Sequence, residues 1–165
     1  EKIEDIARGL ANFHGVGRRC QHYPEIQHAG KTALLIDDYG HHPVELKATL
    51  SALRGAYPEK RMVLIFQPHR YTRTRDLFDD FVSVLSDVDQ LIITEVYPAG
   101  EKPIALADGR ALVRAIRLQG NENAIFAEDI VDAKRKLFNI LQQDDLVVTM
   151  GAGSVGKLPA MLNND

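Results

Sequence analysis

Residues 34–43 are LLIDDYGHHP and residues 63–76 are VLIFQPHRYTRTRD, and these two stretches decide the fold. In each, a run of apolar residues typical of a buried strand ends in a cluster of polar and charged side chains. In open α/β sheets, ligands bind in the crevice outside the carboxyl ends of the strands. If the two strands are neighbours, the clusters lie side by side at that edge. Their arginines and histidines then predict a site for an anionic ligand.

The rest of the chain alternates between strand and helix patterns. Extended segments at 18–27 and 31–37 predict a hairpin around a short turn. Further strands are predicted at 62–66, 91–96, 124–126 and 146–150, with helices over 1–14, after Pro43, over 74–86 and around 111–116 and 133–141. This alternation predicts an α/β fold with a Rossmann-like, mainly parallel sheet, helices on both faces and an N-terminal antiparallel strand or hairpin.

Composition narrows the class of protein. The chain has 165 residues and a formal net charge of −3, which argues against a general binder of nucleic acid or of anionic membranes. No apolar stretch approaches the roughly 18–20 residues of a membrane span. The one cysteine, Cys20, excludes an internal disulfide and favours a reducing, cytoplasmic location. On an apparent strand, Cys20 is predicted to be a small buried hydrophobic residue.

A glycine-rich loop follows the last predicted strand, in LVVTMGAGSVGKLPA at residues 146–160. It contains G-x-G-x-x-G, and all of G-x-x-x-x-G-K-[ST] except the last position, where Leu158 replaces the hydroxyl residue. Without that hydroxyl there is no ligand for Mg²⁺, and Pro159 would disturb a helix that must be regular there. We therefore interpret the loop as a strand-to-helix turn with close backbone packing, with a place in a ligand cleft as the alternative.

Two histidines beside two aspartates, in DDYGHH at 37–42, resemble a metal site. Adjacent residues on an extended segment point in opposite directions, so His41 and His42 cannot both face one ion without a turn. No metal is predicted. A carboxylate at the end of a strand is suited to hydrogen bonds from a ribose or an amine. The competing interpretation is that an Asp or His side chain here caps the next helix.

Three arginines, Arg70, Arg73 and Arg75, lie at the start of a predicted helix, where the helix dipole also favours anions. Guanidinium groups bind carboxylate and phosphate in bidentate geometry, so this turn is suited to positioning an anionic substrate. The competing interpretation is a solvated helix terminus paired with Asp76, Asp79 and Asp80, in which Arg75 is expected to contact Asp79 one turn on.

Four motifs in order resemble the C-terminal domain of the Mur ligase family of peptidoglycan synthesis: DDYGHHP, FQPHRYTRTRD, EVYPAGEKP at 95–103 and GAGSVGK at 151–157. The segment ANFHGVGRR at 11–19 is similar to the junction that precedes this domain. The resemblance covers essentially the whole chain. It implies that residues 1–17 end the preceding central domain and form a linker helix, and that residues 18–165 form the C-terminal domain.

The resemblance implies an ATP-dependent ligase of cell-wall biogenesis, and specifically the members that join L-alanine to UDP-N-acetylmuramate. ATP phosphorylates the carboxylate of the sugar nucleotide, and the amine of L-alanine attacks the acyl phosphate. ATP and Mg²⁺ are expected mainly on the central domain. The partners implied are the two substrates and the remaining domains of the same ligase, with no nucleic acid and no membrane. The domain alone is expected to be inactive.

The resemblance also implies roles for individual residues. Asp38 resembles the carboxylate that meets the ATP ribose, with Asp37 as a substitute, and Arg19 resembles the junction arginine that reaches the nucleotide phosphates.

Catalytic roles are implied for His41, Arg70 and Arg73, around the amino acid and the acyl phosphate. One arginine is expected to hold the alanine carboxylate, and the other to stabilise charge that develops at the reacting centre. Tyr39 and His69 are further candidates for substrate binding.

Two other functions compete with this one. The first is a free-standing nucleotide- or dinucleotide-binding module that uses the glycine loop at 151–156. The second is a related ligase that recycles murein peptides, which the FQPHRYTRTRD pattern disfavours. Two residues depart from the family pattern: Cys20 stands where a Phe is usual, and Pro159 interrupts the expected last helix.

Overall fold

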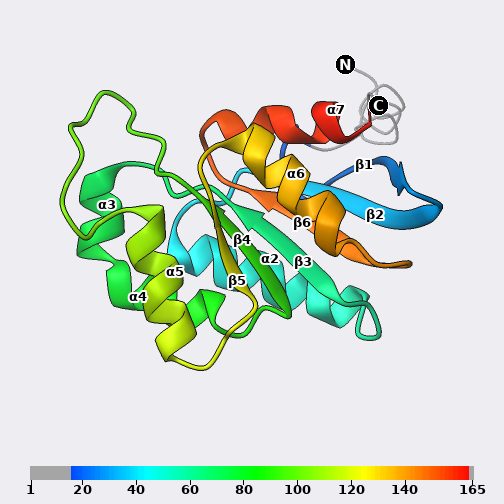
Figure 1. Ribbon diagram of the computed structural model, residues 1–165, viewed down its shortest axis with the longest axis horizontal. Coiled ribbons are helices and arrows are strands. Elements are labelled where there is room, and N and C mark those ends of the chain that lie inside the picture. The colour runs from blue at the N-terminus through cyan, green and yellow to red at the C-terminus, as the bar shows by residue number, and fades with distance from the viewer. Residues whose placement is uncertain (1–15, 164–165) are drawn as a thin grey trace, which may run out of the picture.

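The computed structural model describes residues 16–163, in which six strands form one sheet between two layers of helices (Figure 1). The strands are β1 (Gln21–His28), β2 (Lys31–Asp38), β3 (Met62–Phe66), β4 (Gln90–Thr94), β5 (Ala124–Ala127) and β6 (Leu146–Met150). They lie in the order β1-β2-β6-β3-β4-β5. β1 runs antiparallel to β2, and the other neighbouring pairs are parallel. The predicted α/β fold with an N-terminal hairpin is confirmed.

The helices cover both faces of this sheet. They are α2 (Pro43–Ala56), α3 (Tyr71–Asp76), α4 (Phe78–Leu85), α5 (Gly109–Leu118), α6 (Ile130–Ile140) and α7 (Leu158–Leu162), with a 3₁₀ turn, η1 (Ser154–Lys157), before α7. α2, α4 and α5 pack on one face, and α6 and α7 on the other (Figure 1). The helix predicted over residues 1–14 lies outside the described residues. Within residues 16–163, no helix has the length and apolar character needed to cross a membrane.

The three central strands are apolar along most of their length because helices bury both of their faces. In β3, Leu64 and Phe66 point to the layer of α2, α4 and α5, whereas Val63 and Ile65 point to the layer of α6 and α7. The sheet is thus a rigid support for the loops at its edge.

The helix predicted over residues 74–86 is wrong in its extent. It starts at Tyr71 and is broken at Leu77, whose backbone (φ −117°, ψ 24°) ends α3 and begins α4. The Leu77 N–H still donates to the Arg73 carbonyl, and the Phe81 N–H donates to the Leu77 carbonyl. Because these bonds keep helical spacing across the break, the apolar pattern in the sequence continues through it.

The carboxyl ends of β2, β6 and β3 lie level with one another. Asp38 pairs with Met150, which pairs in turn with Phe66 on the other side. The condition under which the two clusters were predicted to be adjacent, that β2 and β3 are neighbours, is not met, because β6 lies between them. The glycine loop after β6 therefore begins between the ends of these two strands.

Candidate functional site

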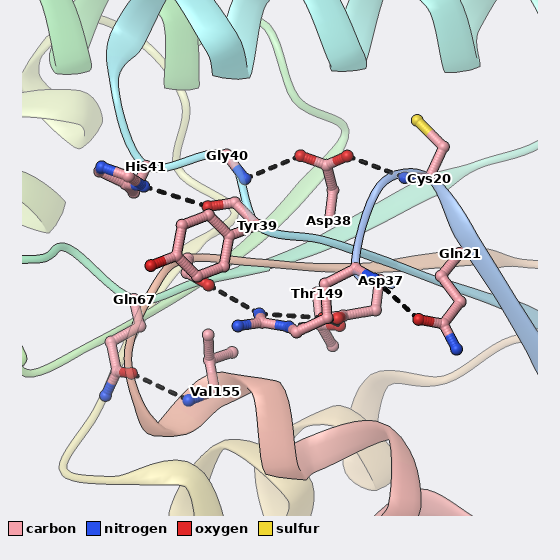
Figure 2. Close-up of polar contacts among 12 residues, drawn as sticks. Cys20, Gln21, Asp37, Asp38, Tyr39, Gly40, His41, Gln67, Thr149 and Val155 are labelled. Carbon is pink, nitrogen blue, oxygen red and sulfur yellow. Dashed lines mark hydrogen bonds and ion pairs between the residues drawn. The ribbon is translucent and has the colours of Figure 1, made fainter. Parts of the chain in front are cut away.

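Asp38 ends β2 and is buried, with both carboxylate oxygens engaged by backbone N–H groups (Figure 2). The Gly40 N–H donates to Oδ1 and the Cys20 N–H donates to Oδ2, each at 2.8 Å. Asp38 therefore holds together the turn after β2 and the segment that enters β1. Its assignment to the ATP ribose remains a prediction.

Asp37 is fully buried on the other side of the strand. It accepts hydrogen bonds from Arg18 Nε at 2.7 Å and from the Thr149 hydroxyl on β6 at 2.5 Å. Arg18 Nη2 also donates to the Gly151 carbonyl at 2.6 Å. The guanidinium thus links the ends of β2 and β6, a contact that the sequence analysis did not foresee.

The two histidines after β2 have separate environments. His42 is the N-cap of α2: its Nδ1 accepts from the Val44 N–H at 3.3 Å, and Glu45 Oε2 accepts from the His42 N–H at 3.1 Å. Helix capping by a His side chain, one of the interpretations left open, is confirmed for His42. Pro43 occupies the first turn, where its missing N–H costs nothing. His41 Nδ1 lies 3.1 Å from the Tyr39 carbonyl instead.

The rings of His41 and His69 bring the first cluster to the second. Their centroids are 5.5 Å apart, and His69 also stacks on Tyr97 at 5.5 Å with an interplanar angle of 9°. Two backbone bonds fix this stack: the Arg70 N–H donates to the Tyr97 carbonyl at 2.9 Å, and the Tyr97 N–H donates to the Pro68 carbonyl at 2.8 Å.

The three arginines of the second cluster differ in their partners. Arg73 Nη1 donates to the His69 carbonyl at 3.2 Å, so its guanidinium lies beside the imidazole. Arg70, with a left-handed φ of 73° and a half-exposed side chain, lies 3.7 Å from Glu101. Arg75 is exposed and pairs with Asp76 at 2.8 Å. For Arg75 the interpretation as a solvated helix terminus is therefore confirmed, with Asp76 as the partner in place of Asp79.

Glu101 lies in the motif EVYPAGEKP but was not among the predicted site residues. Its carboxylate accepts from the Thr72 N–H at 3.0 Å and from the Thr72 hydroxyl at 2.7 Å. These bonds, led by the Thr72 N–H, lower the pKa of Glu101 below its ordinary value. The ionised carboxylate fastens the loop after β4 to the first turn of α3 and keeps a negative charge beside Arg70.

The charges around His69 are otherwise positive. Burial lowers the pKa of His69, and interactions with His41, Arg73 and Arg70 lower it further, while the Glu101 carboxylate opposes them. Near neutral pH the His69 imidazole is therefore uncharged, and it can accept or donate one hydrogen bond at each nitrogen. A ligand that carries negative charge would relieve the repulsion in this cluster.

The glycine loop packs closely against β3 and the loop after β4. A Cβ at Gly153 would lie 2.5 Å from the Tyr97 ring, and one at Gly151 would lie 2.7 Å from the Gln67 carbonyl. Gln67 Oε1 also accepts from the Val155 N–H at 2.9 Å (Figure 2). The predicted strand-to-helix turn with close backbone packing is confirmed. Pro159 stands in the first turn of α7, so it starts this helix and does not interrupt it.

Cys20 is not the buried strand residue that was predicted. It precedes β1 with a left-handed φ of 42°, and its side chain is exposed. Its N–H is turned toward Asp38, which directs the side chain outward. Partial desolvation of the thiol on its inner side, together with the Asp38 charge, raises its pKa. Arg19 beside it is exposed, with its guanidinium carbon 5.6 Å from the centre of the Tyr39 ring.

The edge of the sheet therefore combines cationic groups with aromatic rings. Over residues 16–163, no three His, Cys, Asp or Glu side chains are placed so that they could hold a metal ion. Six side chains can meet an anionic or aromatic ligand: Arg19, Tyr39, His41, His69, Arg70 and Arg73. This arrangement suits phosphate and carboxylate groups.

Known proteins resemble the chain over nearly its whole length. Residues 4–153 match the family described as Mur ligase, glutamate ligase domain. The chain is 62% identical over 161 residues to UDP-N-acetylmuramate–L-alanine ligase of Neisseria meningitidis, and 61% identical over 161 residues to the ligase of that name from Laribacter hongkongensis. Each alignment covers 97% of this chain but 34% of the relative. The chain thus spans about a third of the length of the curated relatives it matches.

Solved structures share the fold. The UDP-N-acetylmuramate–alanine ligase of Thermotoga maritima matches with a TM-score of 0.70 and 22% identity, over 98% of this chain and 33% of that one. A folylpolyglutamate synthase from Thermotoga maritima matches with a TM-score of 0.65 and 20% identity, over 99% of this chain and 34% of that one. At these identities the likeness concerns the fold alone.

Proposed function

The chain belongs to the Mur ligase family as its C-terminal domain, and we propose that it serves the ligase that joins L-alanine to UDP-N-acetylmuramate. In this proposal residues 1–17 end the central domain and form the linker, and residues 18–165 form the amino-acid-presenting domain. The complete enzyme acts in the cytoplasm with ATP and Mg²⁺, which the central domain mainly binds. The domain alone does not turn over.

The observation that carries the proposal is the convergence of His41, His69, Arg70 and Arg73 at one edge of the sheet. An amide ligase that works through an acyl phosphate must bind the carboxylate of the amino acid and stabilise the charge that develops when the amine attacks. Preorganised cations meet both needs, because they require no reorganisation during the reaction. Closure of the domain over the cleft also excludes water, which would hydrolyse the acyl phosphate.

Each arginine takes one of these two tasks. Arg70 is half-exposed and already lies beside a carboxylate, that of Glu101, so we assign it to the carboxylate of L-alanine. Arg73 lies against His69 in the more enclosed part of the cluster, so we assign it to the developing charge. Tyr39 and His41 lie beside this cluster on the turn after β2, with their rings 5.4 Å apart and His41 5.5 Å from His69.

The nucleotide lies toward the other end of the same edge. Arg19 reaches the ATP phosphates and Asp38 meets the ribose. Asp38 already accepts two backbone N–H bonds, but each carboxylate oxygen keeps a second lone pair for a further donor. Asp37 is paired with Arg18 and Thr149, which leaves Asp38 as the better candidate of the two.

Phosphate release by the complete enzyme tests the proposal. It is measured with ATP, Mg²⁺ and UDP-N-acetylmuramate, with and without L-alanine, for the natural sequence, Arg73→Ala and Arg75→Ala. We expect alanine-dependent release that falls about 10²–10³-fold in Arg73→Ala. Arg75→Ala is the matched control, since Arg75 lies in the same helix but pairs with Asp76. Release that ignores L-alanine, or that Arg73→Ala leaves intact, contradicts the proposal.

The competing nucleotide-binding module is tested with the chain alone. If the chain is such a module, the isolated chain binds ATP or NAD with measurable affinity, and replacement of Gly153 abolishes this binding. The ligase proposal expects weak or no binding in that assay, because the complete phosphate-binding site belongs to another domain.

A further inference from the structure

The segment that leads into β1 makes an unusual turn at Arg18, Arg19 and Cys20. Arg18 and Cys20 both have left-handed backbone angles, with φ of 58° and 42°. Side chains with a Cβ rarely adopt this conformation, and it persists only where the surrounding structure holds it. Arg19, the residue between them, carries the exposed guanidinium above Tyr39.

Contacts on both sides hold this turn in place. The Tyr39 N–H donates to the Arg18 carbonyl at 2.7 Å, and the Cys20 N–H donates to Asp38 Oδ2 at 2.8 Å. The Arg18 side chain adds bonds to Asp37 at 2.7 Å and to the Gly151 carbonyl at 2.6 Å. The turn is thereby fastened to the ends of both β2 and β6.

The surroundings of the Arg18 guanidinium are shaped to receive it. A Cβ at Gly156 would lie 2.6 Å from Arg18 Cζ, so the absence of a side chain there leaves room for the group. Asp37 is fully buried, and a buried carboxylate needs a partner to offset its desolvation. A planar guanidinium can donate to the carboxylate and the carbonyl at once, whereas a lysine ammonium is a point charge on a flexible stem.

We propose that Arg18 is a positioning residue for Arg19, and that the Arg18–Asp37–Gly151 contact (the Arg18 clamp) sets the direction in which Arg19 meets the nucleotide. This inference rests on the proposed role of Arg19 at the ATP phosphates. The polar atoms of the Arg18 guanidinium are engaged by Asp37 and the Gly151 carbonyl, and its Cζ lies 5.2 Å from the centre of the Tyr39 ring, the ring that Arg19 also approaches. The glycine loop, incomplete as a phosphate-binding motif, acts here through one backbone carbonyl.

Steady-state kinetics of the complete ligase test the clamp. Arg18→Gln removes the charge, and Arg18→Lys retains it without the fork. In both variants we expect the KM for ATP to rise about tenfold, the effect of one charge-assisted hydrogen bond, with the KM for L-alanine changed less than about twofold. Arg54→Gln is the matched control. Arg54, in the last turn of α2, pairs with Asp89, the residue before β4, at 2.7 Å, the same distance as in the Arg18–Asp37 pair. Arg54→Gln should leave both KM values unchanged.

A double variant separates positioning from folding. Arg18→Gln leaves the buried Asp37 carboxylate without its partner, and Arg18→Gln with Asp37→Asn removes that charge. We expect the double variant to recover thermal stability relative to Arg18→Gln but to keep the raised KM for ATP. If the KM recovers together with the stability, Arg18 is only a structural residue and the inference is overturned.

The dependence on Arg19 is tested in the same assay. Once Arg19→Ala has raised the KM for ATP, adding Arg18→Gln should change it less than about twofold, since no side chain is left to position. If Arg18→Gln raises the KM for ATP a further tenfold in the Arg19→Ala variant, the inference is overturned. If Arg19→Ala itself has no effect on ATP, the inference also fails, while alanine-dependent release that is sensitive to Arg73 would still support the proposed ligase function.

Hydrogen exchange on the complete enzyme gives a readout that does not depend on turnover. The amides of Tyr39 and Cys20 should exchange at least about tenfold faster in Arg18→Gln than in Arg54→Gln, because the turn they close loses its side-chain anchor. Equal exchange in the two variants contradicts the clamp.

Discussion

The imidazole rings of His41 and His69 lie 5.5 Å apart although they follow strands that are not neighbours. β6 separates β2 from β3, and the loops after these two strands turn toward each other beyond its end. The cluster therefore depends on both loops, each held by its own contacts: the His42 cap on one side and the bridge of His69 to Tyr97 on the other.

This proximity predicts how His69 titrates. Burial is the largest cause of its lowered pKa, and His41 is the next. In His41→Asn, the pKa of His69 should rise toward its ordinary value, as measured by NMR titration of the ring protons. His22→Asn on β1 is the control and should leave the pKa of His69 where it is. A pKa that stays unchanged in His41→Asn would show that the two rings do not interact.

The same shift predicts a dependence of stability on pH. His69 has a lower pKa in the folded chain than in the unfolded one, so below about pH 6.5 the unfolded chain binds more protons. The contribution of His69 to the stability of the folded chain is therefore present above this pH. It is lost as the pH falls toward the pKa that His69 has in the folded chain. His69→Asn should flatten the decline in the free energy of unfolding as the pH falls below about 6.5, which denaturant titrations at several pH values measure.

The two site arginines should affect different kinetic constants. In the proposed function Arg70 holds the carboxylate of L-alanine, so Arg70→Ala is expected to raise the KM for L-alanine about tenfold to a hundredfold. Arg73 is proposed to act on the charge of the transition state, so Arg73→Ala should instead lower kcat about 10²–10³-fold. Initial rates at varied L-alanine distinguish the two. An inverted pattern would exchange the two roles within the same site.

Glu101 should act through the arginine turn. In Glu101→Ala the Thr72 N–H loses its acceptor and Arg70 loses its neighbouring carboxylate, so the first turn of α3 is held less firmly. We expect the KM for L-alanine to rise about tenfold and the KM for ATP to stay constant. Glu128→Ala, which removes an exposed carboxylate paired with Arg110, is the control. A lower KM for L-alanine would mean that Glu101 competes with the substrate.

Much of this structure follows from local patterns in the sequence. The strands at 62–66 and 146–150 are found at their predicted bounds, because strands buried on both faces carry uninterrupted apolar runs. The start of α2 after β2 could also be predicted from the sequence, since His42 before Pro43 is a recognisable helix start. What these elements share is that neighbouring residues determine them.

The contacts that escaped prediction join distant parts of the chain. The placement of β6 between β2 and β3 comes from pairing between segments that are far apart in sequence. The Arg18–Asp37 pair spans 19 residues, and its geometry depends on β6 as well, so neither residue type nor spacing indicates it. Cys20 was assigned to a strand because left-handed backbone angles outside glycine have no reliable sequence pattern.

Close packing of the glycine loop gives a last prediction, in which two glycines respond in opposite ways to alanine. At Gly153 a methyl group would lie 2.5 Å from Cγ of Tyr97 and 2.6 Å from Gln67 Oε1, so these side chains and the glycine loop must move away from one another. Gly153→Ala should lower the free energy of unfolding by about 1–3 kcal/mol, as overpacking of a filled space does. Gly55 lies in α2, where a Cβ would have no neighbour within 4 Å, so Gly55→Ala should raise it by about 0.5–1 kcal/mol through better helix propensity. Denaturant midpoints of the two variants measure the difference. Equal stability in Gly153→Ala and Gly55→Ala would mean that the loop yields readily, and that it does not hold Tyr97 and the stacked His69 in place.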